Sequence, residues 1–269
     1  MSETAAPVIL AADSGLGGLT VVAEIRKALP QARLAYLCDN AFFPYGTRPD
    51  AELLAHFLDV MNRAIDRVRP DLIVTACNTI STICLPQLRA ATSIPVVGVV
   101  PAVKPAAQQS KRKIIGLLAT PATVNRPYTD DLIQRYAADC TVLRIGSAEL
   151  VEMAEARLLG EAIDRDGLAR ILAPFFDRPA NMQPDIVVLA CTHFPLLRAE
   201  LEAAGPPGTA WIDSGAAVAR RVLEVLPPAA TPGPDADIAL ASGGCDEALR
   251  RAMMQFGFTS LVPLGAHGG

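Results

Sequence analysis

One sequence phrase occurs twice in this chain, and both occurrences contain a cysteine. Residues 70–79 read Pro-Asp-Leu-Ile-Val-Thr-Ala-Cys-Asn-Thr, and residues 184–193 read Pro-Asp-Ile-Val-Val-Leu-Ala-Cys-Thr-His. In each copy a Pro-Asp turn precedes a short apolar run, and two hydrogen-bonding side chains follow Ala-Cys. The repeat predicts an internal duplication in which two equivalent strands each deliver one thiol, Cys77 or Cys191, at the carboxyl end.

Strand-length apolar runs alternate with amphipathic stretches almost throughout the chain. The apolar runs show little alternation, which is typical of strands buried on both faces of a parallel sheet. The repeated β-α order predicts the α/β class with right-handed crossovers. We expect strands near residues 8–12, 33–38, 72–76, 96–100, 114–119, 142–145, 186–190, 211–212, 238–241 and 260–262. We expect helices near residues 20–29, 51–68, 148–159, 167–176, 216–226 and 246–256.

The duplication predicts two pseudo-symmetric α/β domains with mainly parallel sheets. The first would hold residues 1–97 together with 213–269, and the second would hold residues 98–212. Ligands of open α/β sheets bind beyond the carboxyl ends of the strands, where both cysteines fall. We therefore expect the active site in the cleft between the two domains.

Composition narrows the class of protein. With 269 residues and 51% hydrophobic residues, the chain can bury a substantial core. A net charge of −4 without a basic stripe argues against a nucleic-acid binder. No apolar run approaches the roughly 20 residues that cross a bilayer, and Met1–Thr4 lacks the basic start of a secretory signal. Six cysteines without a C-x-x-C pair fit a reducing compartment, so we expect a soluble, cytoplasmic protein.

The two repeated cysteines are either core residues of buried strands or acid/base groups. Their duplication and their polar neighbours favour the acid/base interpretation. A thiol of ordinary pKa is only about 3% ionised at pH 7, so forming the thiolate costs roughly 2 kcal/mol. A helix beginning after each cysteine would supply about 0.3–1 kcal/mol. A proton partner is therefore expected, and His193 is the candidate for Cys191; the alternative is a loop histidine that caps a turn.

A glycine-rich turn, Asp13-Ser14-Gly15-Leu16-Gly17-Gly18, follows the first expected strand. Its carboxylate argues against a phosphate cradle. Either Asp13 or Ser14 caps the next helix, or Asp13 is the proton partner of Cys77 and Ser14 helps to hold a substrate.

Two further loops would line the same cleft. The Pro44-Tyr45-Gly46 loop offers Tyr45 and backbone N–H groups, and Thr120 and Thr123 offer hydroxyls. A lining rich in neutral donors and poor in Lys and Arg suits a small zwitterion or dicarboxylate.

Taken together, these motifs resemble those of the glutamate racemases in the cofactor-independent aspartate/glutamate racemase superfamily. The likeness covers nearly the whole chain and rests on residues 13–21, 44–46, 76–79, 119–124 and 190–195. It implies interconversion of L- and D-glutamate by a two-base, two-cysteine proton transfer at Cα, with no PLP and no metal. It also implies supply of D-glutamate for peptidoglycan and a homodimer.

The resemblance assigns roles to individual residues. The implied catalytic residues are Cys77, Cys191, Asp13, His193 and Glu152. The implied substrate-binding residues are Asp13, Ser14, Tyr45, Gly46, Asn78, Thr79, Thr123, Thr192 and His193. The chain departs from the family pattern before Glu152, because residues 144–149 lack the usual Cys-Pro-Leu-like segment.

Three alternatives stay open at the level of the sequence. A superfamily relative acting on aspartate, a hydantoin or another small acid would share the paired thiols. A two-domain ligand-binding protein without turnover would share the cleft. A Cys/His metal site is the third.

Overall fold

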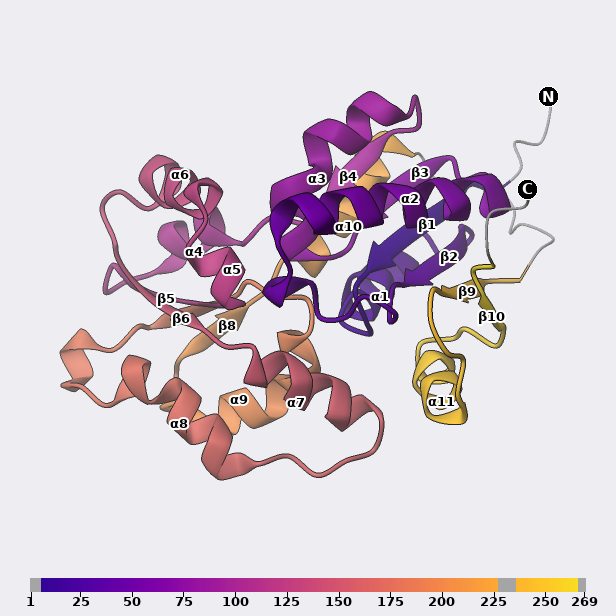
Figure 1. Ribbon diagram of the computed structural model, residues 1–269. Helices are drawn as coiled ribbons and strands as arrows, with labels where there is room; N and C mark the ends of the chain where they lie inside the picture. Colours follow the sequence, from indigo (N-terminus) through magenta and orange to yellow (C-terminus); the bar gives the residue numbers. More distant parts are fainter. Residues whose placement is uncertain (1–5, 227–235, 266–269) are drawn as a thin grey trace. The chain divides into compact units, whose positions relative to one another are not determined.

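The computed structural model describes residues 6–226 and 236–265 (Figure 1). The Met1–Thr4 start and the proline-rich stretch at 227–234 lie outside these residues. The chain divides into two compact units, one formed by Met1–Val99 with Gly215–Gly269 and the other by Val100–Ser214. Within residues 6–226 and 236–265, no helix combines the length and the apolar character needed to cross a membrane.

The first unit is built on a six-stranded sheet in the order β10-β9-β2-β1-β3-β4. All five strand pairings are parallel, and β3 is buried along its whole length. Parallel strands buried in this way explain the continuous apolar runs. The strands are β1 (Val8–Asp13), β2 (Arg33–Cys38), β3 (Leu72–Thr75), β4 (Val96–Gly98), β9 (Ile238–Ala241) and β10 (Leu261–Pro263).

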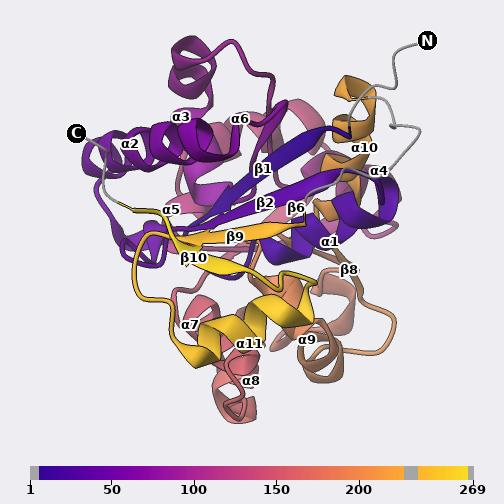
Figure 2. The same ribbon diagram turned by 90° about the vertical axis from the view of Figure 1, so that its right-hand side faces the viewer.

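Amphipathic helices cover this sheet. In α2, side chains at helical spacing, among them Leu53, Phe57 and Met61, are buried in the core. Helix α10 packs on α1, and α11 lies beside β10 and β9 (Figure 2). The helices are α1 (Leu19–Ala28), η1 (Tyr45–Thr47, a 3-10 turn), α2 (Asp50–Val68), α3 (Asn78–Ala91), α10 (Gly215–Val225) and α11 (Glu247–Gln255).

The second unit holds a four-stranded parallel sheet in the order β6-β5-β7-β8. The strands are β5 (Ile114–Ala119), β6 (Thr141–Gly146), β7 (Ile186–Leu189) and β8 (Ala210–Ile212). The helices are α4 (Val103–Gln109), α5 (Pro121–Val124), α6 (Pro127–Tyr136), α7 (Glu149–Leu158), α8 (Arg165–Phe176), η2 (Ala180–Met182), η3 (Phe194–Leu197) and α9 (Arg198–Ala204). The predicted α/β class with parallel sheets is confirmed.

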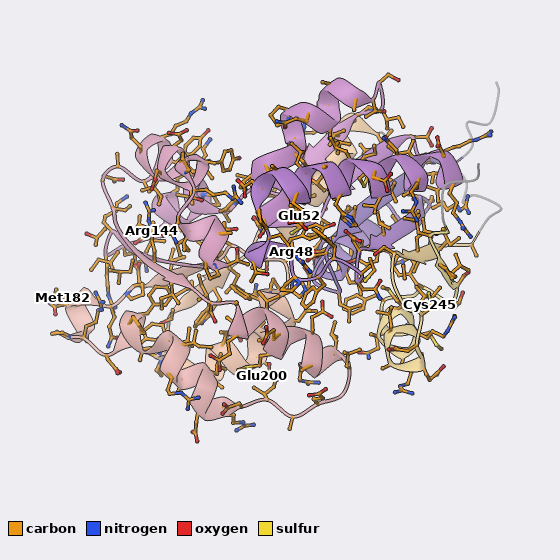
Figure 3. The ribbon with its side chains drawn as sticks, viewed as in Figure 1. Arg48, Glu52, Arg144, Met182, Glu200 and Cys245 are labelled. Atoms are coloured by element: carbon orange, nitrogen blue, oxygen red, sulfur yellow. The ribbon has the colours of Figure 1, made fainter. Side chains whose placement is uncertain are left out.

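Strand β6 departs from the expectation of burial on both faces. It is the edge of its sheet, and only Ile145 among its six residues is buried. The side chain of Arg144, labelled in Figure 3, forms an ion pair with Asp130 of α6 at 2.6 Å. Its charged side chain suits an edge, because charge discourages pairing with another strand.

The two sheets share one topology. Strands β2-β1-β3-β4 of the first unit and β6-β5-β7-β8 of the second have the same order, and β9 and β10 extend only the first. In this correspondence β3 and β7, the strands before the two cysteines, occupy the same position. The repeated sequence phrase therefore marks equivalent places in two related sheets.

The aspartate of each repeat performs the same structural task. Asp71 Oδ2 accepts a hydrogen bond from Val8 N at the start of β1 (2.8 Å). Asp185 Oδ2 accepts from Lys111 N (2.7 Å) and Arg112 N (3.0 Å) just before β5, and its Oδ1 accepts from Ser110 Oγ (2.6 Å). Each carboxylate thus holds the backbone where the neighbouring strand begins.

Asp185→Ala is expected to destabilise the protein by roughly 2 kcal/mol at pH 7, because three donors lose a charged acceptor. Burial raises the pKa of the Asp185 carboxyl, but its hydrogen bonds outweigh this effect and the pKa lies below its usual range. A lowered folded-state pKa means that the stabilisation is present above about pH 4 and is lost as the pH falls through the folded pKa. Thermal unfolding of both proteins across this pH range measures the effect.

Asp71→Ala is the matched control for this substitution. Its exposed carboxylate accepts the one bond from Val8 N, so we expect a loss of less than about 1 kcal/mol at pH 7. Equal losses for the two variants, or a difference at Asp185 that does not shrink in acid, would contradict this account.

Candidate active site

One group of predicted residues lies at the carboxyl ends of β1 and β3. These strands are neighbours, and Ala76 N donates to Ala12 O at 2.8 Å where the ladder ends. Asp13 is the last residue of β1 and is fully buried. Cys77 follows β3 and is 6% exposed. The carboxylate and the thiol therefore leave adjacent strands at the same edge of the sheet.

Cys77 also occupies the N-cap position of α3. Its backbone is extended (φ −137°, ψ 125°), and the 14-residue helix begins at the next residue, as the sequence leads us to expect. The free N–H groups at this end of the helix favour the thiolate by about 0.3–1 kcal/mol.

The glycine-rich turn is shaped by Asp13. Its Oδ1 accepts from Ser14 Oγ (3.1 Å) and from Gly15 N (3.0 Å). The buried Tyr36 hydroxyl donates to Gly15 O at 2.6 Å. Gly18, not Asp13 or Ser14, is the N-cap of α1. The capping alternative is therefore wrong, and the carboxylate instead holds its own turn.

Asn78 and Thr79 begin α3 directly after the thiol, and each is only 3% exposed. Asn78 Oδ1 is buried and has no hydrogen-bond partner among the residues that the structure describes. A buried acceptor left unpaired costs about 1–3 kcal/mol, so its place beside Cys77 calls for an explanation.

Tyr45 and Gly46 lie in the short turn η1. Gly46 is partly exposed, and Tyr45 is buried in the same core cluster as Cys77. Burial, the carboxylate of Asp39, and the nearby groups Cys77 and Asp13 all raise the pKa of Tyr45 well above its usual value. The hydroxyl therefore stays protonated, and it donates to Asp39 Oδ2 at 2.5 Å.

The second group lies at the carboxyl ends of β5 and β7 in the other unit. Cys191 follows β7 and is 6% exposed, and His193 is 2% exposed. His193 Nδ1 lies 3.8 Å from Cys191 Sγ, and its Nε2 lies 2.7 Å from Glu155 Oε1. With Nε2–H donating to the carboxylate, Nδ1 faces the thiol as a hydrogen-bond acceptor.

The glutamate of α7 that lies next to His193 is not the predicted one. Glu152 is exposed, and the carboxylate that contacts His193 belongs to Glu155, three residues later. Helix α7 packs against η3, the turn that follows His193, and this packing presents Glu155 to the imidazole. The expectation for Glu152 is therefore corrected to Glu155.

The segment after Cys191 is also different from the expected helix start. Residues 191–193 form a turn, the 3-10 helix η3 follows, and α9 begins only at Arg198. His193 precedes η3 without a side-chain capping bond, so the turn-capping interpretation is wrong. Cys191 thus lacks the helix N-terminus that follows Cys77, and its sulfur lies beside His193 Nδ1 instead.

The predicted threonines of this unit are buried. Thr192 is 4% exposed and Thr123 is fully buried. Thr120 caps α5 by accepting from Thr123 N (3.2 Å), and its hydroxyl donates to Thr123 Oγ1 (3.0 Å). The pair is therefore partly engaged in shaping its own turn after β5.

The two groups are not chemically equivalent. Ala12 pairs with Thr75, two residues before Cys77, and Leu118 pairs with Leu189, two residues before Cys191. Ala119 consequently stands where the first unit has Asp13. One thiol is accompanied by a carboxylate from the next strand, and the other by a His–Glu pair.

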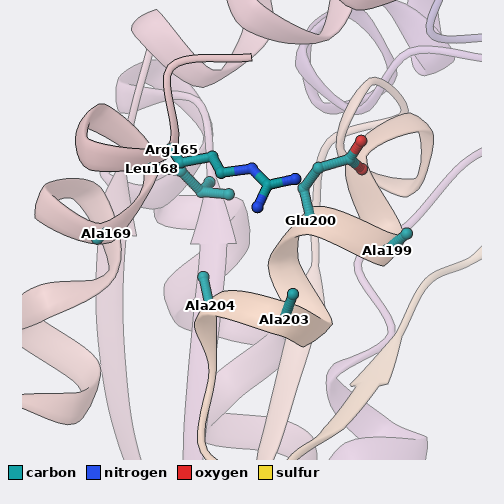
Figure 4. A pocket seen from close by; sticks show the side chains of 7 residues that line it. All are labelled: Arg165, Leu168, Ala169, Ala199, Glu200, Ala203 and Ala204. Carbon is teal, nitrogen blue, oxygen red and sulfur yellow. The ribbon is translucent and has the colours of Figure 1, made fainter.

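A cavity of about 320 Å³ lies elsewhere in the second unit, between α8 and α9 (Figure 4). None of the predicted site residues lines it. It has an alanine-rich wall with two charged side chains and no thiol or imidazole, so it offers no acid/base chemistry. The lining residues are Arg165, Leu168, Ala169, Ala199, Glu200, Ala203 and Ala204.

Two residues of these groups escaped the sequence analysis. Glu155 is one of three glutamates at spacing three in α7, and helical spacing alone does not tell which of them contacts His193. Asp39 follows β2 directly, and a carboxylate at the carboxyl end of a strand is a position that could have been noticed.

Across residues 6–226 and 236–265, no cluster of three His, Cys, Asp or Glu could hold a metal ion.

Comparison with known proteins agrees with the geometry. The family model described as Asp/Glu/hydantoin racemase matches residues 19–222. A glutamate racemase of Pectobacterium carotovorum is 51% identical over 220 residues, which is 82% of this chain and 76% of that protein. A glutamate racemase of Sodalis glossinidius is 45% identical, over 94% of this chain and 89% of that protein.

Solved structures lead to the same group. The crystal structure of Escherichia coli glutamate racemase, in complex with L-glutamate and the activator UDP-MurNAc-ala, matches with a TM-score of 0.92 at 44% identity. The match covers 98% of this chain and all of that one. A Bacillus anthracis glutamate racemase isoform matches with a TM-score of 0.78 at 26% identity, over 96% of this chain and 97% of that one.

Proposed function

The chain belongs to the Asp/Glu/hydantoin racemase family, and we propose that it interconverts L- and D-glutamate without a cofactor, using Cys77 and Cys191. The observation that carries the proposal is the Cys191–His193–Glu155 series, in which the thiol and the imidazole are buried and the carboxylate is partly buried. Such a series suits proton relay and is hard to explain as core packing. Identities of 45–51% with glutamate racemases support glutamate as the substrate.

In the proposed reaction one cysteine is a thiolate and the other a thiol. The thiolate removes the Cα proton from one face of the substrate, and the thiol delivers its own proton to the opposite face. Each turnover leaves the two protonation states exchanged, and the reverse reaction restores them. The proposal requires both sulfur atoms to reach the same carbon from opposite sides.

Ionising a thiol of ordinary pKa at pH 7 costs about 2 kcal/mol, and the site has to offset this free energy for whichever cysteine is the thiolate. For Cys77 the N-terminus of α3 supplies part of this, and Asp13 is proposed to accept or share the proton. For Cys191 the imidazole of His193 accepts the proton, and Glu155 stabilises the imidazolium that results.

The substrate contacts follow from what each group can donate or accept. Asn78 Oδ1, the buried unpaired acceptor, is suited to the ammonium group of an amino acid. Hydroxyls and backbone N–H groups are suited to its carboxylates. We propose Ser14, Thr79, Thr123 and Thr192, with the N–H groups of the Tyr45-Gly46 turn, for this task.

We further propose a cytoplasmic homodimer that supplies D-glutamate for peptidoglycan. None of the six cysteines, all of which lie within the described residues, forms a disulfide, which supports a reducing compartment. Analytical ultracentrifugation measures the oligomeric state directly.

The decisive measurement is the optical rotation of L- or D-glutamate during incubation with enzyme freed of metal by chelation and free of PLP. We expect the signal of either enantiomer to decay to zero. The second candidate substrate is aspartate, because the family includes aspartate racemases by description. Faster decay with L-aspartate than with L-glutamate would reassign the substrate, and no decay with either would overturn the function.

Gly18→Ala is expected to lower kcat/KM for glutamate by about a hundredfold, because a misplacement near 1 Å at the reacting groups costs this much. A Cβ at Gly18 would lie 2.7 Å from Asp13 Cβ, 2.9 Å from Tyr36 Oη and 3.0 Å from Ala76 Cβ. At these distances the neighbouring groups must shift, and Asp13 is the nearest of them. Gly244→Ala is the control, since a Cβ there meets nothing within 4 Å; equal activity of the two variants would refute the prediction.

A further inference from the structure

A buried cluster of polar side chains lies behind Tyr45 in the first unit. Its centre is Asp39, which is fully buried and follows β2. Asp39 Oδ2 receives Tyr45 Oη–H at 2.5 Å and His56 Nε2 at 2.7 Å. Asp39 Oδ1 receives the hydroxyl of Ser242. Three donors from η1, α2 and the segment after β9 therefore converge on one carboxylate.

Further hydrogen bonds connect the two segments that hold Asp39 and Ser242. Ser242 N donates to Cys38 O (3.1 Å), and Ser242 Oγ accepts from Ala41 N (3.1 Å). Asn40 Oδ1 accepts from Gly243 N at 2.8 Å. The segment after β2 and the segment after β9 are thus fastened together on both sides of Asp39.

His56 is held in place by aromatic packing. Its ring stacks on Phe42 with centroids 4.0 Å apart and planes 18° from parallel. Arg48, labelled in Figure 3 near the start of α2, lies with its guanidinium 4.3 Å from the centroid of the Phe42 ring. The imidazole side chain is 26% exposed, whereas that of Asp39 is 1% exposed. His56 therefore holds Nε2 in a fixed position against the buried carboxylate.

These contacts decide what Tyr45 can do. A tyrosine has one O–H, and in Tyr45 that proton is donated to Asp39. The raised pKa keeps the hydroxyl protonated, so it has no second proton to offer. The side chain that was expected to bind the substrate therefore has its one hydrogen engaged by Asp39. What the turn can still present to a ligand is the backbone of Tyr45 and Gly46.

We propose that Asp39 is a positioning residue of the active site, which with His56 and Ser242 holds Tyr45 so that the Tyr45-Gly46 backbone is fixed for substrate binding. This inference rests on the proposed racemase function. It differs from that function in assigning the Tyr45 hydroxyl to Asp39 and not to glutamate.

A double-mutant cycle separates the two assignments. Asp39→Ala is expected to lower kcat/KM for glutamate on the order of a hundredfold, chiefly through KM, and Tyr45→Phe about tenfold. In the Asp39→Ala background, Tyr45→Phe is expected to cost nothing further, because the partner of the hydroxyl is already gone. If the hydroxyl binds glutamate directly, Tyr45→Phe costs the same factor in both backgrounds, and the inference is overturned.

His56 offers a second route that does not depend on the folding of Asp39→Ala. His56→Leu removes one donor to Asp39 and is expected to raise KM several-fold, roughly the value of one charge-assisted hydrogen bond. His56→Gln can place an amide N–H where Nε2 lies and is expected to restore most of the loss. A general loss of packing would not be rescued by glutamine, so this rescue distinguishes positioning from packing. Equal KM values for His56→Leu, His56→Gln and the unmodified enzyme would overturn the inference.

Tyr136→Phe, a hydroxyl removal on α6 of the other unit, is the control and should leave both KM and kcat unchanged. The unmodified enzyme is assayed alongside. If it racemises neither glutamate nor aspartate, the proposed function fails; if it is active and the cycle is multiplicative, only the positioning role of Asp39 fails.

Discussion

Replacing either Cys77 or Cys191 by serine is expected to reduce racemisation of glutamate by at least about a thousandfold, within the range for loss of a general acid/base group. Serine keeps the shape of cysteine but its hydroxyl is far less acidic than a thiol. A hydroxyl can neither remove the Cα proton as a thiolate does nor be regenerated cheaply after donating one. Loss of one partner therefore stops the exchange in both directions.

The measurement is the decay of optical rotation from each pure enantiomer, combined with deuterium incorporation at Cα in D₂O. In the unmodified enzyme the product enantiomer should acquire solvent deuterium before the remaining substrate does, because separate groups remove and return the proton. Equal early labelling of substrate and product would indicate a single base that serves both faces.

Cys84→Ser is the matched control. Cys84 lies in α3 about two turns after Cys77 and is fully buried, and burial raises the pKa of its thiol to about 12. Such a thiol stays protonated and inert, so the variant should keep its turnover once folded. Wild-type rates in both Cys77→Ser and Cys191→Ser would refute the two-thiol mechanism.

The strands could be predicted from the sequence because their signals are local, whereas the helices α4, α5, α6 and α9 were not among those expected. Each expected strand appears within about two residues of its expected bounds, since a short apolar run between turn signals needs no distant information. The position of a strand within its sheet is not local. The run 142–145 gives no sign that β6 is an edge, and only the order β6-β5-β7-β8 explains its exposure.

The positions of the candidate site residues divide in the same way. Cys77 and Cys191 could be found because the repeated phrase marks equivalent strand ends. Glu155 could not be told from Glu152, since the choice depends on how α7 packs against η3. Asp39 was missed because its partners, Tyr45, His56 and Ser242, come from three separate elements.

The contact between Glu155 and His193 predicts the second large effect on activity. Glu155→Gln should lower kcat/KM for glutamate by about a hundredfold, because glutamine can still accept from His193 Nε2–H but cannot stabilise the imidazolium. Glu152→Gln, on the same helix but exposed, is the control and should stay within about twofold.

The equilibrium between the two enantiomers constrains the kinetic effect of Glu155→Gln. L- and D-glutamate have equal free energies, so the equilibrium constant is one and kcat/KM must fall by the same factor in both directions. The asymmetry between the Asp13 side and the His193–Glu155 side can then appear only in how kcat and KM divide that factor for each enantiomer. We expect Glu155→Gln to alter this division, since it changes the proton affinity on the Cys191 side alone. Should Glu152→Gln produce the loss and Glu155→Gln leave kcat/KM intact, the carboxylate that contacts His193 would have no part in proton transfer, and the relay would be structural.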